Sequence, residues 1–369
     1  MANKAYKFRI YPTKEQEQLM MKTFGCVRFV YNKMLAERKE TYEQFKDDKE
    51  MLKKQKHPTP AKYKAEFEWL KEVDSLALAN AQMNLQKSYR NFFAGRAKFP
   101  QFKARKAKQS YTTNLVNGNI RLLNGHIQLP KLKTVKLTQH RDIPPHHKIK
   151  SCTISRSATG KYYISILTEY AHKPVPKEVK ALVGLDFAMD GLYVESEQGE
   201  KANHPRFYRQ TQEKLAKEQK VLSRRMKGSA RYEKQRLRVA AVHEQVANQR
   251  KDFLHKKSRQ LANQYDGVVI EDLNMKGMSQ SLHFGKSVAD NGWGMFTTFL
   301  QYKLGEQGKH LIKINKWFPS IKTCSHCGHV KQMALSERRY ACECGFVCDR
   351  DWNAAINIKN EGKMMLALS

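Results

Sequence analysis

Two cysteine pairs near the C-terminal end constrain the fold of this chain more than any other feature of its sequence. The first pair reads Cys324-Ser-His-Cys327-Gly, and the second reads Cys342-Glu-Cys344-Gly. Four thiolates can close a tetrahedral site around Zn²⁺. The glycine after each pair lets the backbone turn so that its amides face the sulfurs. Two such pairs, 14 residues apart, predict a zinc ribbon.

The number and position of the cysteines favour a metal site over disulfide bonds. The chain has seven cysteines, an odd number, and five of them fall between residues 324 and 348. A disulfide framework usually spreads its cysteines and pairs them evenly. Because the second pair is tighter than the usual Cys-x-x-Cys, Cys348 and His329 stay open as alternative fourth ligands. The isolated Cys26 and Cys152 are expected to be small buried hydrophobes.

The chain is also strongly basic. Its 369 residues include 68 Lys and Arg against 35 Asp and Glu, for a formal net charge of +33. Such a chain repels itself unless a polyanion neutralises it, which points to nucleic acid. No apolar stretch approaches the ~18 residues of a membrane span, and no apolar signal-peptide core stands at the start. We therefore expect a cytoplasmic protein that works with nucleic acid and has no membrane partner.

The first half of the sequence predicts a basic β module with a helical insertion. Residues 96–180 carry 18 Lys and Arg against 3 Asp and Glu. Turn signals at Asn124-Gly125 and at Gly160 predict two hairpins. An earlier strand over 5–10 is expected to join this module. The expected elements between them are a capping box at Thr13 and Gln16, a helix to about 48 with a break at Gly25, a loop over 49–62, and a helix over 75–93.

From residue 181 the sequence reads as an α/β domain. Residues 209–259 hold 16 Lys and Arg against 5 Asp and Glu, an excess that indicates a phosphate-facing surface rather than a merely solvated one. The predicted elements are strands at 182–187 and 192–199, two long helices over 209–265, a strand at 268–270, a helix around 295–305, and a strand at 311–314. Trp317 and Phe318, which precede the ribbon, are expected in the core.

Three acidic residues far apart in the sequence are candidates for catalysis. Asp186 and Glu271 each end an apolar strand, and Asp351 lies in Asp349-Arg-Asp351 at the start of a helix. An acid in such a place is most often a turn or cap residue. Together, however, the three supply the hard carboxylate oxygens that two Mg²⁺ ions need for phosphodiester hydrolysis, and no single loop could surround both ions.

These motifs, in this order, resemble the TnpB (OrfB) family, transposon-associated proteins similar to the type V CRISPR effectors. The resemblance covers nearly the whole chain and has small departures, chiefly the tight second cysteine pair. The motifs that carry it are Phe-Arg-Ile-Tyr-Pro-Thr near the start, Gly25-x-x-Arg28-x-x-Tyr31-Asn32, Phe99-Pro-x-Phe-Lys103, Gly-Leu-Asp186-Phe, Ile-Glu271-Asp-Leu, Trp317-Phe-Pro-Ser, the first cysteine pair, and Asp-Arg-Asp351-x-Asn-Ala-Ala.

The resemblance implies an α/β plus α+β architecture. A RuvC-like (RNase H-like) nuclease domain with an inserted zinc ribbon would follow a basic β-barrel-like module that carries a helical insertion. The implied domains are the first strand of the basic β (wedge) module at 1–12, a helical recognition insertion at 13–95, the rest of the β module at 96–178, the nuclease domain at 179–316, the target-binding zinc ribbon at 317–348, and the end of the nuclease domain with the tail at 349–369.

The resemblance also implies an activity: an RNA-guided DNA endonuclease of an insertion-sequence transposon. A guide RNA from the transposon end would direct Mg²⁺-dependent cutting of double-stranded DNA beside a short adjacent motif. Structural Zn²⁺ would complete the cofactors. A prokaryotic, nucleoid-associated protein is expected, with a monomer as the working assumption. Two rival functions are an RNA-guided repressor that has lost cleavage, which should lack an acid, and a DNA transposase.

The motif matches place catalysis and Mg²⁺ binding on Asp186, Glu271 and Asp351, with Asp349 as the second choice for the last position. Asp190 and Asp272 are candidates for outer partners, although a structural role is the stronger expectation for both. Other candidates are supports of the site at Arg350 and Asn353, and nucleic-acid contacts at Tyr31, Asn32, Lys103, Arg105, Lys106 and Lys108. For Tyr31, helix packing is an equally good interpretation.

Overall fold

The computed structural model of the chain describes residues 1–106, 108–281, 285–334 and 336–367. Its contacts divide the chain into two compact units, Met1–Lys173 and Pro174–Ser369, and each unit is described by itself. None of the helices in the described ranges combines the length and the apolar character needed to cross a membrane.

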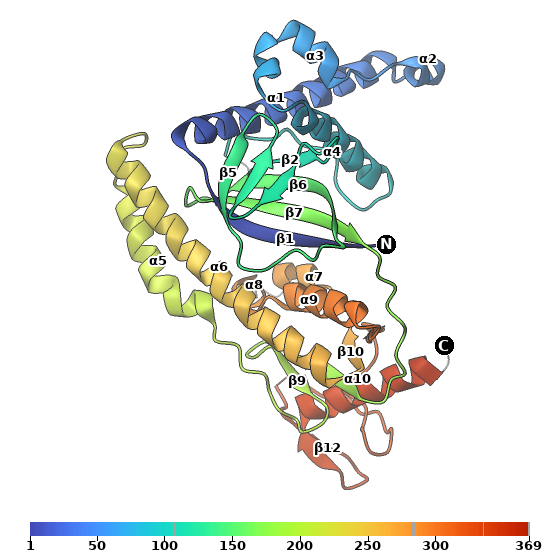
Figure 1. The fold of residues 1–369 in the computed structure, drawn as a ribbon. Coiled ribbons are helices and arrows are strands. Elements are labelled where there is room, and N and C mark those ends of the chain that lie inside the picture. The colour runs from blue at the N-terminus through green and yellow to red at the C-terminus, as the bar shows by residue number, and fades with distance from the viewer. Residues whose placement is uncertain (107, 282–284, 335, 368–369) are drawn as a thin grey trace. The chain divides into compact units, whose positions relative to one another are not determined.

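The first unit is built on an antiparallel sheet, whose seven described strands follow the order β2-β6-β7-β1-β5-β4-β3 (Figure 1). Its strands are β1 (Ala2–Tyr11), β2 (Gln109–Asn114), β3 (Arg121–Leu123), β4 (His126–Leu129), β5 (Lys133–Thr138), β6 (Lys148–Arg156) and β7 (Tyr162–Tyr170). The predicted strand at 5–10 lies within β1, which pairs with β7 and β5 and so does join the module. Both predicted hairpins are confirmed, β3–β4 and β6–β7.

The described part of the sheet has two open edges, where the resemblance implied a β-barrel-like module. Among the described strands, the pairings run from β2 at one edge to β3 at the other, and no pairing joins those two edges. Alternation along β1 nevertheless buries one face. Tyr6, Phe8 and Ile10 are 4%, 1% and 0% exposed, and they belong to one hydrophobic core shared with the helices.

The helical insertion is more continuous than predicted. Its helices are α1 (Lys14–Phe45), α2 (Lys49–Lys54), α3 (Pro60–Glu66), the short 3₁₀ helix η1 (Glu68–Glu72) and α4 (Ser75–Phe93). The capping box at Thr13 and Gln16 begins α1 as predicted. The predicted break at Gly25 is wrong, since Phe24 and Val27 on either side are buried and their packing outweighs the weak helix preference of glycine. The predicted loop over 49–62 contains α2 and the start of α3.

The second unit holds a mixed sheet in the order β11-β10-β8-β9. Its strands are β8 (Leu182–Phe187), β9 (Tyr193–Glu195), β10 (Gly267–Glu271) and β11 (His310–Ile314). The strands β8, β10 and β11 run parallel, and β9 is the antiparallel hairpin partner of β8. The continuous apolar sequences of β8 and β10 are typical of parallel strands that are buried on both faces.

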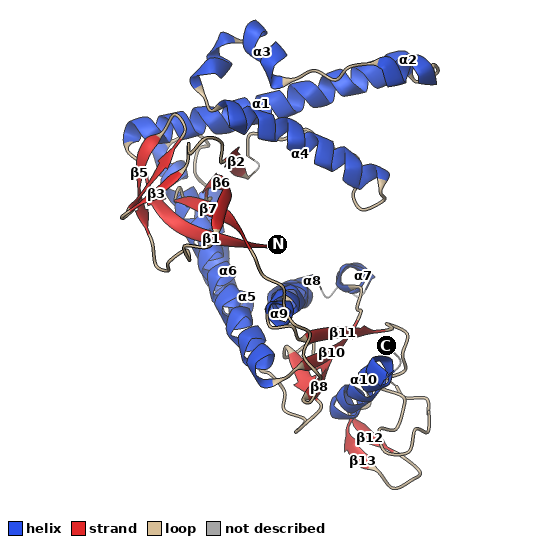
Figure 2. Ribbon diagram, turned by 45° about the vertical axis from the view of Figure 1, so that its right-hand side comes forward, coloured by secondary structure: helices blue, strands red, loops and turns tan. Residues whose placement is uncertain are grey.

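Helices cover both faces of this sheet. The helices of this unit are α5 (Phe207–Ser223), α6 (Ala230–Gln264), α7 (Met275–Ser281), α8 (Gly285–Asn291), α9 (Trp293–Glu306) and α10 (Arg350–Ala367). Of these, α6 and α9 lie on one face of the sheet and α10 lies on the other. Val268 and Ile270 of β10 pack with residues of α6 and α9, while Val269 between them packs with Ile358 of α10. Figure 2 shows α9 and α10 on opposite sides of β10 and β11.

A glycine allows α10 to lie close against the sheet. A Cβ atom at Gly184 of β8 would collide with the carbonyl oxygen of Ala355, and it would lie 2.6 Å from the backbone nitrogen of Lys359. This close approach places the first turn of α10 near the end of β8. The chain between β11 and α10 forms the small ribbon, with β12 (Arg339–Ala341) and β13 (Val347–Asp349) paired antiparallel.

Candidate active site

Asp186 lies near the end of the central strand β8 and is buried, with only 8% of the residue exposed. Burial raises the pKa of its carboxyl well above the usual range, because a buried charge loses its hydration. The negative charges of Glu271 and Asp351 raise that pKa further. Arg350 and the backbone N–H of Phe187 act in the opposite direction. Glu271 and Asp351 therefore lie near enough to Asp186 to act on the pKa of its carboxyl.

Glu271 ends the neighbouring parallel strand β10. The register pairs Ile270 with Leu185, so the next position along each strand brings Glu271 beside Asp186. Burial raises the pKa of Glu271, and a hydrogen bond from Ser320 lowers it. The Ser320 hydroxyl donates to Oε1 of Glu271 at 2.6 Å. Two strand ends therefore deliver two carboxylates to one edge of the sheet.

Asp351 lies in the first turn of α10. The contacts of Asp349 and Asp351 show that these two candidate acids of the motif have different roles. Oδ1 of Asp349 accepts hydrogen bonds from the backbone N–H groups of Asp351 and Trp352 at 2.9 and 3.1 Å, so Asp349 caps the helix. The guanidinium of Arg350 donates from Nε and from an Nη to Oδ1 of Asp351 at 2.9 and 2.7 Å. Asp351, rather than Asp349, is the acid whose charge acts on Asp186.

Two other predicted acids lie outside this group. Asp190 forms an ion pair with Lys201, whose hydrogen bond lowers the pKa of the Asp190 carboxyl, and 62% of the Asp190 side chain is exposed. Asp272 forms an ion pair with Lys313 at 3.1 Å and is similarly exposed. Both observations agree with the structural roles expected for these two residues.

Three polar side chains tie the acidic site to the start of the ribbon. Asn353 of α10 donates to the carbonyl of Thr323 at 2.7 Å, and its Oδ1 accepts from the N–H of Ser325 at 3.0 Å. Asn357, one turn later, donates to the carbonyls of Ser320 and Thr323. Asn353 was predicted as a support, whereas Ser320 and Asn357 were missed. The spacing of the two asparagines, four apart on one helix face, was the available signal.

The four predicted cysteines come together in the ribbon. Their sulfur atoms all lie within 4.8 Å of one another, and the structure shows no disulfide among them. Sγ of Cys324 is 3.8 Å from Sγ of Cys344, and Sγ of Cys327 is 3.6 Å from Sγ of Cys342. A tetrahedron with Zn–S bonds of about 2.3 Å has edges of about 3.8 Å, so the cluster fits zinc.

The local backbone explains how the four sulfurs come together. The two alternative zinc ligands, Cys348 and His329, are not part of the cluster. Gly328 and Gly345 adopt positive φ values of 78° and 84°, where a side chain would be strained. Cys348 lies outside the sulfur cluster and packs with Tyr340 and Met333 in the ribbon's small hydrophobic core. The carbonyl of His329 accepts from the N–H of Cys324 at 2.8 Å, which is a structural contact.

In the first unit, two residues predicted to contact nucleic acid lie against Lys103. Oδ1 of Asn32 accepts from the N–H of Lys103 at 2.8 Å, and its amide donates to the carbonyl of Lys103 at 3.1 Å. Tyr31 is 4% exposed, and the ammonium of Lys103 lies 4.0 Å from the centre of its ring. Tyr31 and Asn32 are thus packed in the helix and hold Lys103. Arg105 and Lys106 are exposed.

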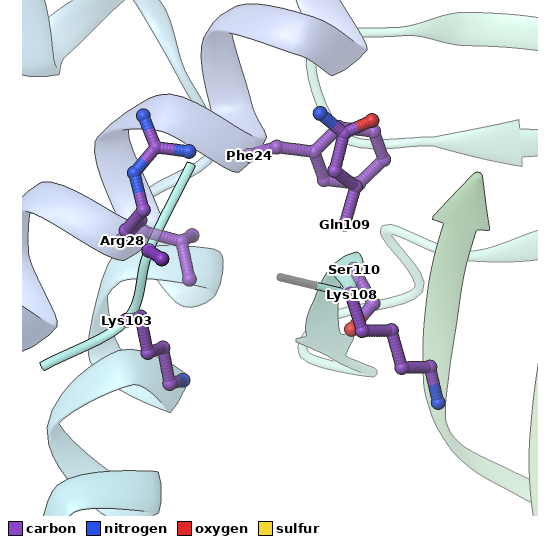
Figure 3. Close-up of a pocket in the computed structure, with 8 residues that line it drawn as sticks. Phe24, Arg28, Lys103, Lys108, Gln109 and Ser110 are labelled. Carbon is purple, nitrogen blue, oxygen red and sulfur yellow. The ribbon is translucent and has the colours of Figure 1, made fainter. Parts of the chain in front are cut away.

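A basic pocket of about 290 Å³ lies between α1 and the segment that leads into β2 (Figure 3). Arg28 of α1, Lys103 and Lys108 line it, together with the apolar side chains of Phe24 and Val27. Among the residues the structure describes, none of these three cations has an acidic partner within ion-pair distance. Burial lowers the pKa of Lys103. Arg28 was not among the predicted contact residues, although it lies in one of the family motifs.

Comparison with known proteins identifies the class to which this fold and site belong. Sequence models of three domains match the chain: the IS605 OrfB domain, described as "Probable transposase", over residues 165–282, the OrfB "Helix-turn-helix domain" over 1–47, and the "Cas12f1-like, TNB domain" over 293–358. In the structure, residues 1–47 form the strand β1 and the single long helix α1.

Curated relatives match over almost the full length. A protein of Streptomyces pristinaespiralis, named "Putative RNA-guided DNA endonuclease", is 36% identical over 364 residues, which cover 97% of this chain and 89% of the relative. The relative InsQ of Escherichia coli K12, with the same description, is 31% identical over 98% of this chain and 93% of its own. The chain therefore belongs to the TnpB (OrfB) family of IS605-type insertion sequences.

A solved structure supports the fold. The protein chain in the cryo-EM structure of a Cas12f1–sgRNA–target DNA complex aligns with a TM-score of 0.62, over 97% of this chain and 99% of that one. The sequence identity is 12%, so this likeness speaks for the fold alone.

Proposed function

We propose that this protein is an RNA-guided DNA endonuclease. Its catalytic residues are Asp186, Glu271 and Asp351. The observation that carries the proposal is the convergence of these acids at one edge of the sheet. Two of them end adjacent parallel strands, and the charges of Glu271 and Asp351 raise the pKa of the buried Asp186. The names of the full-length relatives support the same activity. The corresponding domain is the proposed RuvC-like nuclease domain, formed by 179–316 and 349–369.

The acidic site has the chemistry expected of a Mg²⁺ site. Buried carboxylates near one another repel, and that repulsion is relieved when a divalent cation is held between their oxygens. Asp186 and Glu271 would hold the ions from the strand ends, and Asp351 from α10. When bound, a pair of such ions supplies an activated water and stabilises the leaving oxygen of a phosphodiester. Arg350 orients Asp351 through Oδ1, and Ser320 orients Glu271 through Oε1.

The first unit is proposed to hold nucleic acid, with the wedge module at 1–12 and 96–178 and the recognition insertion at 13–95. Three cations without acidic partners line its basic pocket, and a phosphate would neutralise them. The exposed Arg105 and Lys106 extend this basic surface. Guide RNA from the transposon end and double-stranded target DNA are the proposed occupants. Pairing between guide and target would supply sequence specificity, and the protein would read the short adjacent motif.

We propose structural Zn²⁺ in the ribbon at 317–348, held by Cys324, Cys327, Cys342 and Cys344. The sulfur spacing supports this assignment, and the ribbon would contact target nucleic acid. A metal here would also stabilise the segment that leads back to Ser320. The protein is proposed to act as a monomer in the prokaryotic cytoplasm, in association with the nucleoid.

One observation favours a second function. The matching domain at 165–282 carries the description of a transposase. A transposase would join DNA ends, whereas the proposed endonuclease cuts a target that an RNA specifies. A repressor without cleavage is less well supported, because all three acids are present and the pKa of Asp186 responds to both of the others.

The deciding experiment is to purify the protein, sequence any RNA that co-purifies, and program that RNA against a DNA duplex in Mg²⁺. The proposal predicts RNA-dependent double-strand cutting at the programmed site. RNA-independent cutting, or joining of DNA ends, would favour the transposase instead.

A further inference from the structure

Trp317 is the most exposed large apolar side chain in the part of the chain that the structure describes, with 80% of the residue in solvent. The expectation that it lies in the core is therefore wrong. Its neighbour Phe318 is partly buried and packs against Val269, Ile314 and Ile358. An indole gains more from burial than most side chains and is enriched at interfaces, so an exposed indole on a folded segment is a candidate contact for a partner.

The exposure of Trp317 belongs to an ordered turn. The backbone N–H of Trp317 donates to Oδ1 of Asn315 at 2.9 Å, and the N–H of Phe318 donates to the carbonyl of Asn315 at 3.0 Å. The N–H of Ser320 donates to the carbonyl of Phe318 at 2.8 Å. With Phe318 packed inward, the turn fixes the backbone of Trp317 at the surface.

The backbone of Trp317 lies a short chain distance from a residue of the acidic site, and its indole lies beside a positive charge. Trp317 and Ser320 are three residues apart, so their Cα atoms are separated by at most about 11 Å. Ser320 itself donates to Glu271 at 2.6 Å. The ammonium of Lys316 lies 5.0 Å from the centre of the Trp317 ring. An aromatic face next to a cation is the combination that binds unpaired nucleotides, by base stacking and phosphate attraction.

We propose that Trp317 is a stacking platform for one unpaired base of a single DNA strand bound at the acidic site. A base inside a duplex already stacks on its neighbours, so only a strand without a partner offers its face to the indole. Since a stacked strand advances about 3.4 Å per nucleotide, the base on Trp317 would lie a few nucleotides from the phosphate at Glu271. This inference rests on the proposed function and names the form in which the acidic site takes its substrate.

The test measures stacking without cutting. The full-length protein with its co-purified RNA carries Asp186→Ala, so that DNA stays intact, and is titrated with a six-nucleotide oligo-deoxythymidine. Stacking of a base quenches the fluorescence of the indole involved. We expect quenching in this background and in the added control Trp69→Phe, whose indole is 42% exposed in the first unit. The quenching should disappear with Trp317→Phe.

Affinity and cutting supply the second arm. Trp317→Ala should weaken oligonucleotide binding about 5- to 150-fold, whereas Trp317→Phe, which keeps an aromatic face, should stay within a few-fold. With Asp186 intact, Trp317→Ala should slow cutting of single-stranded DNA, and Trp317→Phe should largely restore it. Quenching does not depend on cleavage. A wild-type protein that fails to cut therefore counts against the proposed function, while the quenching result still tests the stacking role of Trp317.

Three results would overturn the inference. One is quenching that persists in Trp317→Phe. The second is equal binding and cutting by Trp317→Ala and wild type. The third is a change of oligomeric state, rather than of DNA binding, in Trp317→Ala, since it would assign the exposed indole to a contact between copies of this chain.

Discussion

The hydroxyl of Ser320 donates a 2.6 Å hydrogen bond to Oε1 of Glu271, and the carbonyl of the same Ser320 accepts from the amide of Asn357 at 2.8 Å. One residue at the start of the ribbon therefore connects the end of strand β10 to helix α10. The acidic site and the ribbon share this segment, so the order of one depends on the other.

Ser320→Ala removes the hydrogen bond to Glu271 while leaving the backbone contact with Asn357 possible. Substitution of a residue that hydrogen-bonds to a metal ligand typically lowers metal affinity or activity by about 10- to 100-fold. We expect the cleavage rate to fall within that range and the Mg²⁺ requirement to rise. Cleavage rates measured across Mg²⁺ concentrations test this. Ser325→Ala is the matched control on the same segment and should cut normally. Equal Mg²⁺ requirements in the two variants would contradict the role given to Ser320.

Asp186→Asn should abolish cutting and yet stabilise the protein when no divalent cation is present. The pKa of the Asp186 carboxyl is raised in the folded protein. Its ionised form is thus disfavoured there, and stability falls as pH rises from the unfolded pKa through the folded one. The asparagine avoids this loss. Near neutral pH its melting temperature should exceed that of wild type, by roughly 2–4 °C for each kcal/mol relieved.

The same pair of proteins reports on the cation. Added Mg²⁺ should raise the melting temperature of wild type by binding the folded state, and should have little effect on Asp186→Asn. The difference between the two proteins without Mg²⁺ should shrink toward pH 4, where the Asp186 carboxyl is protonated and neutral, as asparagine is at every pH. A wild type that melts higher than the variant in the absence of cations would contradict the account of this site.

The zinc assignment separates the cluster cysteines from Cys348. Substitution of Cys344 by serine should lower the zinc content measured by mass spectrometry of the purified protein and expose the remaining thiols. Cys348→Ala should retain one zinc ion per chain, because its sulfur lies outside the cluster. Loss of zinc in Cys348→Ala with retention in Cys344→Ser would reverse the assignment.

His255 gives the second unit a sensitivity to acid. Its ring stacks on Phe299 with centroids 3.8 Å apart, and burial, followed by the nearby charge of Lys303, lowers the pKa of His255 to about 4. The unfolded chain takes up this proton near pH 6.5. The contribution to stability is therefore complete above pH 6.5 and is lost as pH falls toward 4.

His255→Phe keeps a ring against Phe299 but cannot be protonated. Its melting temperature should fall less than that of wild type between pH 7 and pH 5. Thermal melting of the two proteins over this range provides the comparison. Identical acid sensitivity would show that His255 contributes nothing to it.

Much of the fold could be predicted from sequence because its signals are local. The apolar strands that end at Asp186 and Glu271 and the capping box at Thr13 are all found where the patterns indicated. The break predicted at Gly25 failed because tertiary packing around the helix overrides local preference. The cysteine cluster could be predicted from the spacing of the two cysteine pairs, because few backbone conformations bring four sulfurs so close together.

The role of Ser320 and the exposure of Trp317 depend on the three-dimensional structure and not on sequence spacing. Ser320 lies in the Trp317-Phe-Pro-Ser motif, but the motif does not show its contact with Glu271, 49 residues away in the chain. Trp317 has the large apolar side chain of a typical core residue. Its exposure to solvent becomes visible only in the three-dimensional structure of the turn. Conversely, Tyr31 was open between two interpretations, and its burial shows that it packs within the helix.

The central claim is that the three carboxylates form the catalytic site of an endonuclease, and that an RNA selects the DNA sequence to be cut. The most direct measurement compares programmed cleavage by wild type, Asp186→Ala and Asp190→Ala with one RNA and one duplex in Mg²⁺. Asp190 is the matched control, since it lies four residues away and is paired with Lys201 at the surface. We predict that wild type and Asp190→Ala cut at the programmed site and that Asp186→Ala does not. Cutting by Asp186→Ala at the wild-type rate would contradict the account.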